Sequence, residues 1–366
     1  MAEDYDVVVV GAGVMGTSAA RWLATRNRTT LLLERFEIGH ARGSSGGQTR
    51  IFRLTYHHPD YVRMARRALE EWRALEAEAG ETLLITTGGV DVGVGGRVSA
   101  QALEAAGEAF ESLSADAVRE RWPALRLEPG TESFVQEDGG VCMAERTVRA
   151  QARLAASAGA RVLEGTAVER IVATGTGAEV VAGGEAYRAP VVVVTAGPWA
   201  GGLLRAAGID LSLEPSLEQV THFELDDPSP LPTVIEWSDD GTWAPYAVPN
   251  PEEPGRFKVA LHRSGPPVDA DARSFDPDPE RVRRVMEYAS GRFATHRERG
   301  SETCLYTNTP DEDFVLDRRG PVVIGSPCSG HGFKFAPLIG RILADLATAQ
   351  PAPLPIERFL TVRFGR

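Results

Sequence analysis

The hydrophobic pattern at the start of the chain predicts a strand, a helix and a second strand. Residues 7–10 form an unbroken valine run, which is typical of a parallel strand covered on both faces. Ala19 and Leu23 then recur at helical spacing, and the apolar stretch 30–33 follows and ends at Glu34. Because this is the order of elements in a βαβ unit, we expect a parallel sheet flanked by helices.

Farther along, apolar stripes at helical spacing alternate with short β-like runs. A helix is predicted from Asp60, as its N-cap, to about Ala79, where Gly80 ends it. A second helix contains Ala106 and Phe110. The remaining predictions are helices at 148–158 and 336–348, strands at 83–87, 89–94, 161–165, 168–173, 191–195 and 315–325, and a β-rich region from about Leu217.

This alternation predicts an α/β protein of two interleaved domains. A nucleotide domain would comprise 1–84, 144–215 and 308–366, and a second, sheet-rich domain would comprise 85–143 and 216–307. The length of 366 residues agrees, because a single hydrophobic core stops growing beyond about 250–300 residues.

Composition and charge narrow the class of protein. The net charge of −12 argues against nucleic acid and against an anionic membrane as general partners. The longest uncharged run, 189–204, is shorter than the roughly 20 residues of a membrane-spanning helix. We expect no signal peptide, because no basic leader precedes residues 7–10. Three cysteines predict a reducing compartment, the cytoplasm, without a disulfide framework.

A glycine-rich motif, GAGVMG at 11–16, directly follows the first predicted strand. Gly11, Gly13 and Gly16 let the backbone approach a pyrophosphate, and the helix that begins there directs free N–H groups toward it. Glu34 lies about 20 residues beyond and can accept hydrogen bonds from a ribose diol. The sequence therefore favours an unphosphorylated ribose, as in FAD or NAD rather than NADP.

Two further segments gather basic residues. The Ser/Gly-rich run 44–53 suggests close backbone approach to a ligand, and on a helical turn its Arg50 and Arg53 would share one face. Surface charge is the alternative for this pair. In 256–262, alternation places Lys258 and His262 on the face opposite three apolar side chains. Alone, that pattern fits an edge strand that exposes its charges to water.

Two more segments lie toward the C-terminus. Gly330 and Gly332 precede the last predicted helix, where backbone N–H groups could stabilise negative charge on a reduced cofactor ring. An ordinary glycine-rich turn is the alternative. Cys304 begins the run Cys-Leu-Tyr-Thr, and a lone cysteine is usually a buried, inert residue.

Together, the four segments resemble the monomeric sarcosine oxidase family of flavoproteins, which includes N-methyltryptophan oxidase, pipecolate oxidase and related oxidases of antibiotic biosynthesis. The similarity runs from Asp6 to about Ala349 and is densest at 43–56, 304–317 and 329–335. It implies a Rossmann-type, glutathione-reductase-like FAD domain of the D-amino-acid-oxidase-like superfamily, interleaved with an antiparallel-sheet substrate domain.

The resemblance also implies roles for single residues, and it implies no metal. Cys304 would carry a thioether to the 8α position of the flavin. Arg53 and Lys334 would hold the substrate carboxylate, with Tyr246 shaping the pocket. The implied catalytic residues are Lys258, which is credited with activating oxygen, and Arg50, His262 and Tyr306. The residues implied to bind FAD are Gly11, Gly13, Gly16, Glu34, Arg42, Ser44, Ser45, Thr49, Arg50, Val168, Gly197, Cys304, Gly330, Gly332 and Lys334.

The chemistry of these residue types agrees with the implied roles. Arg53 offers a planar fork to a carboxylate and Lys334 adds a point charge, so together they can fix the substrate α C–H over a flavin ring. A preorganised cation such as Lys258 stabilises the anion that forms when oxygen accepts an electron. His262 is a candidate base, with packing or hydrogen bonding as an equal alternative.

Several positions depart from the family pattern. Gly46 stands where many relatives have histidine, Leu54-Thr55 replaces His-Ala, and Ala260-Leu261 replaces Gly-Tyr. The segment 237–246 is rich in aromatic residues, Trp237, Trp243 and Tyr246 among them. Because aromatic walls bury more ligand surface, we expect the substrate to be a larger or cyclic amino acid at least as readily as sarcosine.

The sequence thus predicts an FAD-dependent amine oxidase that converts a secondary or cyclic amino acid to an imine and reduces O2 to H2O2. Its partners would be the amino acid and O2, and it would be a monomer or small homo-oligomer. One alternative is a dehydrogenase that passes electrons to a protein or a quinone. Another is a flavin-binding protein without catalysis. A reductase that uses a pyridine nucleotide is disfavoured, since there is one complete fingerprint and no redox-paired cysteine.

Overall fold

A six-stranded sheet forms the centre of the nucleotide half of the molecule. The computed structural model describes residues 3–237 and 244–365. The sheet is parallel except at its last strand, and both of its faces are covered, which explains why its strands are unbroken apolar runs. Its strands, in spatial order, are β10 (Arg161–Leu163), β3 (Thr30–Leu33), β2 (Val7–Val10), β14 (Val191–Val194), β21 (Val322–Ser326) and β20 (Val315–Arg319).

Helices cover one face of this sheet and a smaller sheet covers the other. On the helical face, α1 (Val14–Ala24) packs between α5 (Ala144–Ser157) and α8 (Ala336–Ala347), and α2 (Pro59–Ala79) lies outside them. The opposite face carries α6 (Ala200–Ala206) and a four-stranded sheet. The strands of that smaller sheet are β1 (Glu3–Asp4), β13 (Glu185–Ala189), β12 (Gly177–Ala182) and β11 (Val168–Thr174).

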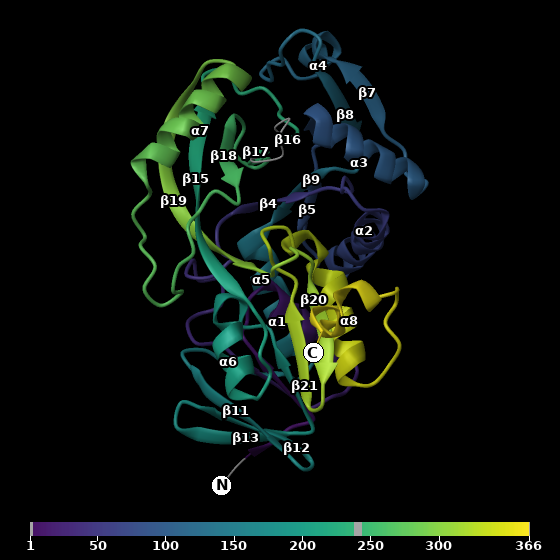
Figure 1. Ribbon diagram of the computed structural model, residues 1–366, viewed down its shortest axis with the longest axis vertical. Helices are drawn as coiled ribbons and strands as arrows, with labels where there is room; N and C mark the ends of the chain where they lie inside the picture. Colours follow the sequence, from purple (N-terminus) through teal and green to yellow (C-terminus); the bar gives the residue numbers. More distant parts are fainter. Residues whose placement is uncertain (1–2, 238–243, 366) are drawn as a thin grey trace.

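An eight-stranded sheet dominates the other end of the molecule, at the top of Figure 1. It is antiparallel except where β16 pairs with β6. Helices α3 (Gly93–Ala105), α4 (Ala115–Arg121) and α7 (Pro279–Arg292) accompany it. Its strands are β19 (His296–Asn308), β15 (Glu214–Leu225), β18 (Arg256–His262), β17 (Ala244–Pro249), β16 (Thr233–Glu236), β6 (Gly89–Val92), β8 (Glu132–Gln136) and β7 (Glu111–Ser114).

A small antiparallel sheet lies between the two large ones (Figure 1). It consists of β4 (Thr49–Phe52), β9 (Gly140–Met143) and β5 (Leu84–Thr86), and β4 also contacts β17 of the large sheet. Four short 3₁₀ helices complete the described elements: η1 (Gly197–Trp199), η2 (Phe333–Phe335), η3 (Glu357–Phe359) and η4 (Thr361–Phe364).

The predicted elements are mostly confirmed, with shifted ends. The βαβ unit and the last helix lie where the pattern placed them, and Gly80 ends α2 in a left-handed conformation. The predicted N-cap was wrong: the His58 side chain accepts the hydrogen bond from the Asp60 N–H, so α2 begins at Pro59. Helix α3 ends at Ala105 and excludes Phe110.

The fold class is the predicted one, a Rossmann-type half joined to an antiparallel-sheet half. Three separate chain pieces contribute strands or helices to the six-stranded sheet and its cover, as a discontinuous domain requires. The residues at which the predicted domains begin and end stay a prediction. Of the helices in the described part of the chain, none is long and apolar enough to cross a membrane.

Candidate functional site

A cavity of about 590 Å³ runs from the glycine turn after β2 to the inner face of the eight-stranded sheet. Its walls come from the ends of β2 and β3, the segment 43–53, strands β17, β18 and β19, and the turn before η2. The cavity thus joins the nucleotide half to the sheet-rich half. Most of the predicted site residues lie on its wall, although they are far apart in the sequence.

The glycine motif shapes one end of the cavity. Gly11 adopts φ 92°, and a Cβ there would lie 2.8 Å from the carbonyl oxygen of Thr195. Gly13 lines the cavity beside Ser45. Gly16 does not line the cavity; a side chain there would overlap the Gly11 carbonyl, so its role is the close packing of α1 on the strand.

Glu34 is a buried carboxylate at the same end of the cavity. Its Oε2 accepts a hydrogen bond from the Ala12 N–H at 2.7 Å, and its Oε1 accepts one from the Phe36 N–H at 2.9 Å. Burial acts to raise the pKa of Glu34, but hydrogen bonds from His40 and from these backbone groups outweigh it and lower the pKa. A carboxylate with about four acceptor positions keeps capacity for a further donor, such as a ribose hydroxyl.

The serine-rich segment closes over the start of α1. Ser45 Oγ accepts a hydrogen bond from the Val14 N–H at 3.1 Å, whereas Ser44 Oγ is buried and has no partner among the described residues. A Cβ on Gly46 would lie 2.7 Å from the Cα of Ala41, so this backbone has no room for a histidine there. Arg42 is exposed and does not line the cavity, contrary to expectation.

Arg50 and Lys258 meet at one backbone oxygen. The Thr49 carbonyl accepts hydrogen bonds from Arg50 Nη1 at 2.8 Å and from Lys258 Nζ at 2.7 Å. The two arginines do not lie on a helical turn, the condition under which they would share one face: Arg50 lies in strand β4, which pairs with β9, and Arg53 follows directly after that strand. The sheet places both arginines on the cavity wall.

Lys258 occupies an interior strand of the eight-stranded sheet. The predicted two-residue alternation is confirmed, because Phe257, Val259 and Leu261 are in the apolar core while Lys258 and His262 line the cavity. The edge-strand alternative was wrong, since β18 pairs with β15 and β17. Burial, with the Arg50 cation beside it, lowers the pKa of Lys258 to about 7.

Arg53 and Lys334 come together around the ring of Tyr56. The Arg53 guanidinium carbon lies 4.4 Å from the ring centroid, and Lys334 Nζ donates to the Tyr56 hydroxyl at 2.9 Å. Lys334 also donates to the carbonyl of His331 at 2.7 Å. Burial and the Arg53 cation lower the pKa of Lys334 well below its ordinary value. The two cations therefore form one basic corner of the cavity.

His262, Tyr306 and Tyr246 form the neighbouring wall. His262 Nδ1 lies 3.4 Å from the Tyr306 hydroxyl, and Gly330 accommodates the Tyr306 ring because any side chain there would overlap it. Burial, aided by the Arg53 cation, lowers the pKa of His262 to about 3, so the imidazole is neutral at ordinary pH. Cys304 also lines the cavity, and burial raises the pKa of its thiol.

Sequence reasoning gave no role to two contributors to the basic corner, Asp91 and His331. Asp91 is 2% exposed and lies 3.9 Å from Arg53 Nη1. The signal for Asp91 was an acid inside an otherwise apolar predicted strand. His331 lies beside Tyr56, a contact that depends on the fold. Trp237, from the aromatic segment expected to pack against the substrate, lines the cavity 5.9 Å from the Arg53 guanidinium carbon. Trp243, named with the aromatic segment, lies outside the described residues.

The arrangement suits an anionic ligand that reacts beside a dinucleotide. Cations line the wall at Arg50, Arg53, Lys258 and Lys334, and Glu302 is an acid among them. Within the described part of the chain, no group of three or more His, Cys, Asp or Glu side chains could hold a metal ion.

Comparison with known proteins places the chain in a family. Residues 6–346 match the family described as DAO, FAD dependent oxidoreductase. The monomeric sarcosine oxidase of Arthrobacter sp. (strain TE1826) is 33% identical, over 98% of this chain and 96% of its own. The N-methyl-L-tryptophan oxidase of Yersinia pestis (strain Pestoides F) is 27% identical, over 99% of this chain and all of its own.

A solved structure agrees with these relatives. The open form of NikD, an unusual amino acid oxidase essential for nikkomycin biosynthesis, superposes with a TM-score of 0.89. It is 28% identical, covering 98% of this chain and 97% of its own. With a family match that spans nearly the whole chain and relatives aligned from end to end, this protein belongs to the DAO family of FAD-dependent oxidoreductases.

Proposed function

We propose that the chain is an amine oxidase that uses FAD to oxidise the C–N bond of a secondary or cyclic amino acid to an imine and reduces O2 to H2O2. The observation that carries this proposal is the meeting of Arg53 and Lys334 around Tyr56, inside a cavity that begins at a dinucleotide motif. The names of the sarcosine and N-methyltryptophan oxidases support N-methyl amino acids as the substrate class.

The residues at the nucleotide end fit FAD. Gly11 and Gly13 leave space for a pyrophosphate at the N-terminus of α1, and the buried Ser44 hydroxyl, without a partner among the described residues, could donate to it. Glu34 would accept from a ribose hydroxyl, and Val168 lines the cavity nearby. When bound, FAD supplies the acceptor for the two electrons and the hydrogen that leave the substrate carbon.

The basic corner would hold the substrate carboxylate. Arg53 presents a planar fork and Lys334 a point charge, so the carboxylate could be bound from two sides. Because Lys334 is buried and the Arg53 side chain is only 12% exposed, their attraction to a carboxylate is screened less than at the surface. Trp237 and Tyr246 line the same region and would pack against the substrate side chain, which supports a substrate larger than sarcosine.

The protonation states of the site residues suit amine oxidation. The reacting nitrogen must be uncharged, so that its lone pair can assist the departure of hydrogen from the neighbouring carbon. His262 is neutral and adds no positive charge beside that nitrogen. Lys258 and Arg50 share the Thr49 carbonyl and would present their cations where reduced oxygen carries negative charge.

We further propose that Cys304 joins FAD through a thioether. Cys304 lies on the cavity wall. Burial raises the pKa of its thiol, while the Arg50 and Lys258 cations act in the opposite direction and favour the thiolate. None of the cysteines at 142, 304 and 328 forms a disulfide, which supports a reducing compartment, and we propose the cytoplasm. The monomer or small homo-oligomer predicted from the sequence stays a prediction.

The test is peroxide release by the flavin-loaded protein with a panel of N-methyl and cyclic amino acids. We expect at least one of them to be oxidised with stoichiometric peroxide. No turnover with any of them, together with no anaerobic bleaching of the flavin, would contradict the proposal. Bleaching followed by slow reoxidation in air would instead support a dehydrogenase with a different electron acceptor.

A further inference from the structure

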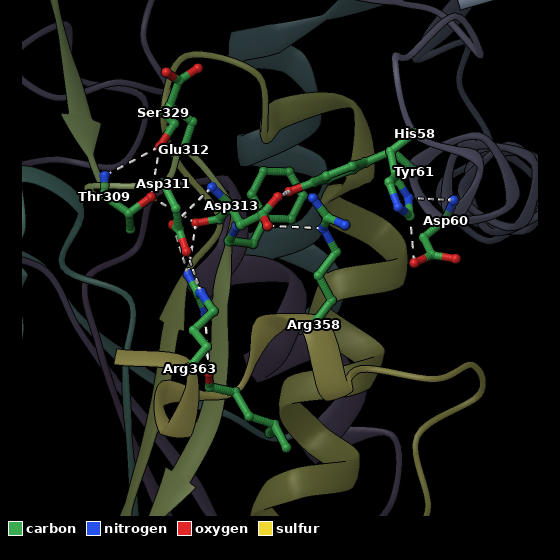
Figure 2. Close-up of polar contacts among 12 residues, drawn as sticks. His58, Asp60, Tyr61, Thr309, Asp311, Glu312, Asp313, Ser329, Arg358 and Arg363 are labelled. Atoms are coloured by element: carbon green, nitrogen blue, oxygen red, sulfur yellow. Dashed lines mark hydrogen bonds and ion pairs between the residues drawn. The ribbon is translucent and has the colours of Figure 1, made fainter. Parts of the chain in front are cut away.

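We propose that Arg358 and Arg363 are positioning residues that hold Lys334 at the carboxylate site, acting through the turn at 311–313. Both arginines lie in the C-terminal segment, in η3 and η4, outside the cavity wall. The inference rests on the proposed function, since it concerns the lysine assigned to the substrate carboxylate. Figure 2 shows the side chains of the two arginines extending toward Asp311 and Asp313, the aspartates of this turn.

Two arginines fix the two aspartates of the turn. Arg363 makes a two-point contact with Asp311, from Nε to Oδ2 at 2.7 Å and from Nη2 to Oδ1 at 3.2 Å. Its Nη2 also donates to the Asp313 carbonyl at 3.2 Å, while Arg358 Nε lies 2.9 Å from Asp313 Oδ2. A two-point guanidinium contact fixes orientation as well as distance, so the turn is held from both of its ends.

Glu312, between the two aspartates, has an unfavourable backbone conformation. Its φ is 64°, which is uncommon for a residue with a side chain and persists only where the surroundings impose it. Its carbonyl oxygen lies 3.2 Å from Nε2 of His331 and its side chain pairs with Arg263. Because a carbonyl can only accept, His331 carries a hydrogen on Nε2. Burial lowers the pKa of His331 well below its ordinary value, so the ring is neutral and its Nδ1, 3.4 Å from the Tyr56 hydroxyl, is unprotonated.

Two routes lead from the turn to Lys334. Through His331, the turn fixes the carbonyl that accepts from Lys334 Nζ at 2.7 Å. Through Tyr61, whose hydroxyl donates to Asp313 Oδ1 at 3.0 Å, it fixes a ring stacked 5.0 Å from that of Tyr56. The Tyr56 hydroxyl accepts the second Lys334 hydrogen bond. Two of the three ammonium donors are thereby oriented, and the third is left for the substrate carboxylate.

Because the chain contains few lysines, the accessibility of Lys334 can be measured directly by chemical modification. The sequence contains two lysines, Lys258 and Lys334, and all other Lys+Arg positions are arginine. Both lysines are buried on the cavity wall, but in the described contacts only Lys334 is bonded to Tyr56 and His331. An amine-selective reagent therefore reports on Lys334, with Lys258 as an internal reference in the same molecule.

The experiment compares the wild type with the double variant Arg358→Gln/Arg363→Gln, using acetylation by N-hydroxysuccinimidyl acetate followed by peptide mass spectrometry. We expect Lys334 to be acetylated at least about tenfold faster in the variant, with the rate at Lys258 unchanged. With an amino acid that the wild type oxidises, we expect the variant's KM to rise by a similar factor while its kcat changes less than about twofold. Arg153→Gln, which removes an exposed pair with Glu81 elsewhere on the surface, is the matched control.

Equal acetylation of Lys334 in the double variant and in the control would overturn the proposal. If the double variant does not fold, Arg363→Lys is measured in the same way, since it keeps the charge but loses the two-point contact with Asp311. Acetylation needs no turnover. A wild type that oxidises no amino acid therefore contradicts the proposed function alone, and the role of the two arginines is judged independently.

Discussion

The cavity concentrates its chemistry in a few buried cations whose protonation is set by their neighbours. Lys258 is 6% exposed, and Arg50, which is bonded to the same carbonyl, opposes its protonation. Arginine keeps its charge at any ordinary pH, whereas a buried lysine can lose it. The two positions therefore differ in kind: Arg50 is a fixed charge, and Lys258 is a charge that pH can remove.

Replacing Lys258 by methionine is expected to slow the reaction with oxygen. The variant keeps the length and apolar body of the side chain but loses the cation, so we expect the rate constant for reoxidation in air to fall about 10²–10³-fold. Anaerobic reduction by an amino acid is expected to change much less. Both rates are measured by stopped-flow absorbance. Equal loss in the two half-reactions would show that Lys258 supports binding or folding rather than the oxygen step.

The pH dependence of the same step follows from the pKa of Lys258. With a pKa of about 7, the ammonium form is dominant below that pH and is lost above it. We therefore expect the reoxidation rate of the reduced protein to fall as pH rises through 7. Above pH 7 the rate is expected to fall by up to about tenfold for each further pH unit. The Lys258→Met variant provides the control, since its profile is expected to be flat. A rate that rises across the same interval would contradict this assignment.

The secondary-structure elements show how far the sequence could be interpreted. Long apolar runs and alternation were reliable, because the βαβ unit and the faces of β18 depend on local spacing alone. A helical turn at Arg50 and Arg53, which their spacing would have allowed, does not form because β4 pairs with β9, some 90 residues away. Asp91 stood out locally as an acid inside an apolar run, but its partner Arg53 is on another element, so local sequence could not reveal the pair.

The turn before η2 depends on a glycine for a reason that can be tested. Gly330 has φ 77°, and a side chain there would also overlap the Tyr306 ring. We expect Gly330→Ala to lower the free energy of unfolding by more than the roughly 1–3 kcal/mol of a strained backbone alone. Gly208→Ala is the control, because Gly208 has φ 79° and open space around it. Urea denaturation measures the free energy of unfolding of both variants. Equal losses would show that the Tyr306 ring moves aside without an energetic penalty.

Across the whole molecule, the cavity is walled by both large sheets, so a bound cofactor is expected to couple their stability. A Cys304→Ala variant cannot form the proposed thioether, so FAD would bind it without a covalent bond and unfolding would depend on the FAD concentration. A ligand at 100 times its Kd adds about 2.7 kcal/mol to the folded state, so Tm is expected to rise steadily with added FAD. Scanning calorimetry at several FAD concentrations measures this. If two transitions appear and only one of them moves with FAD, the sheets unfold separately and the cofactor stabilises only one half.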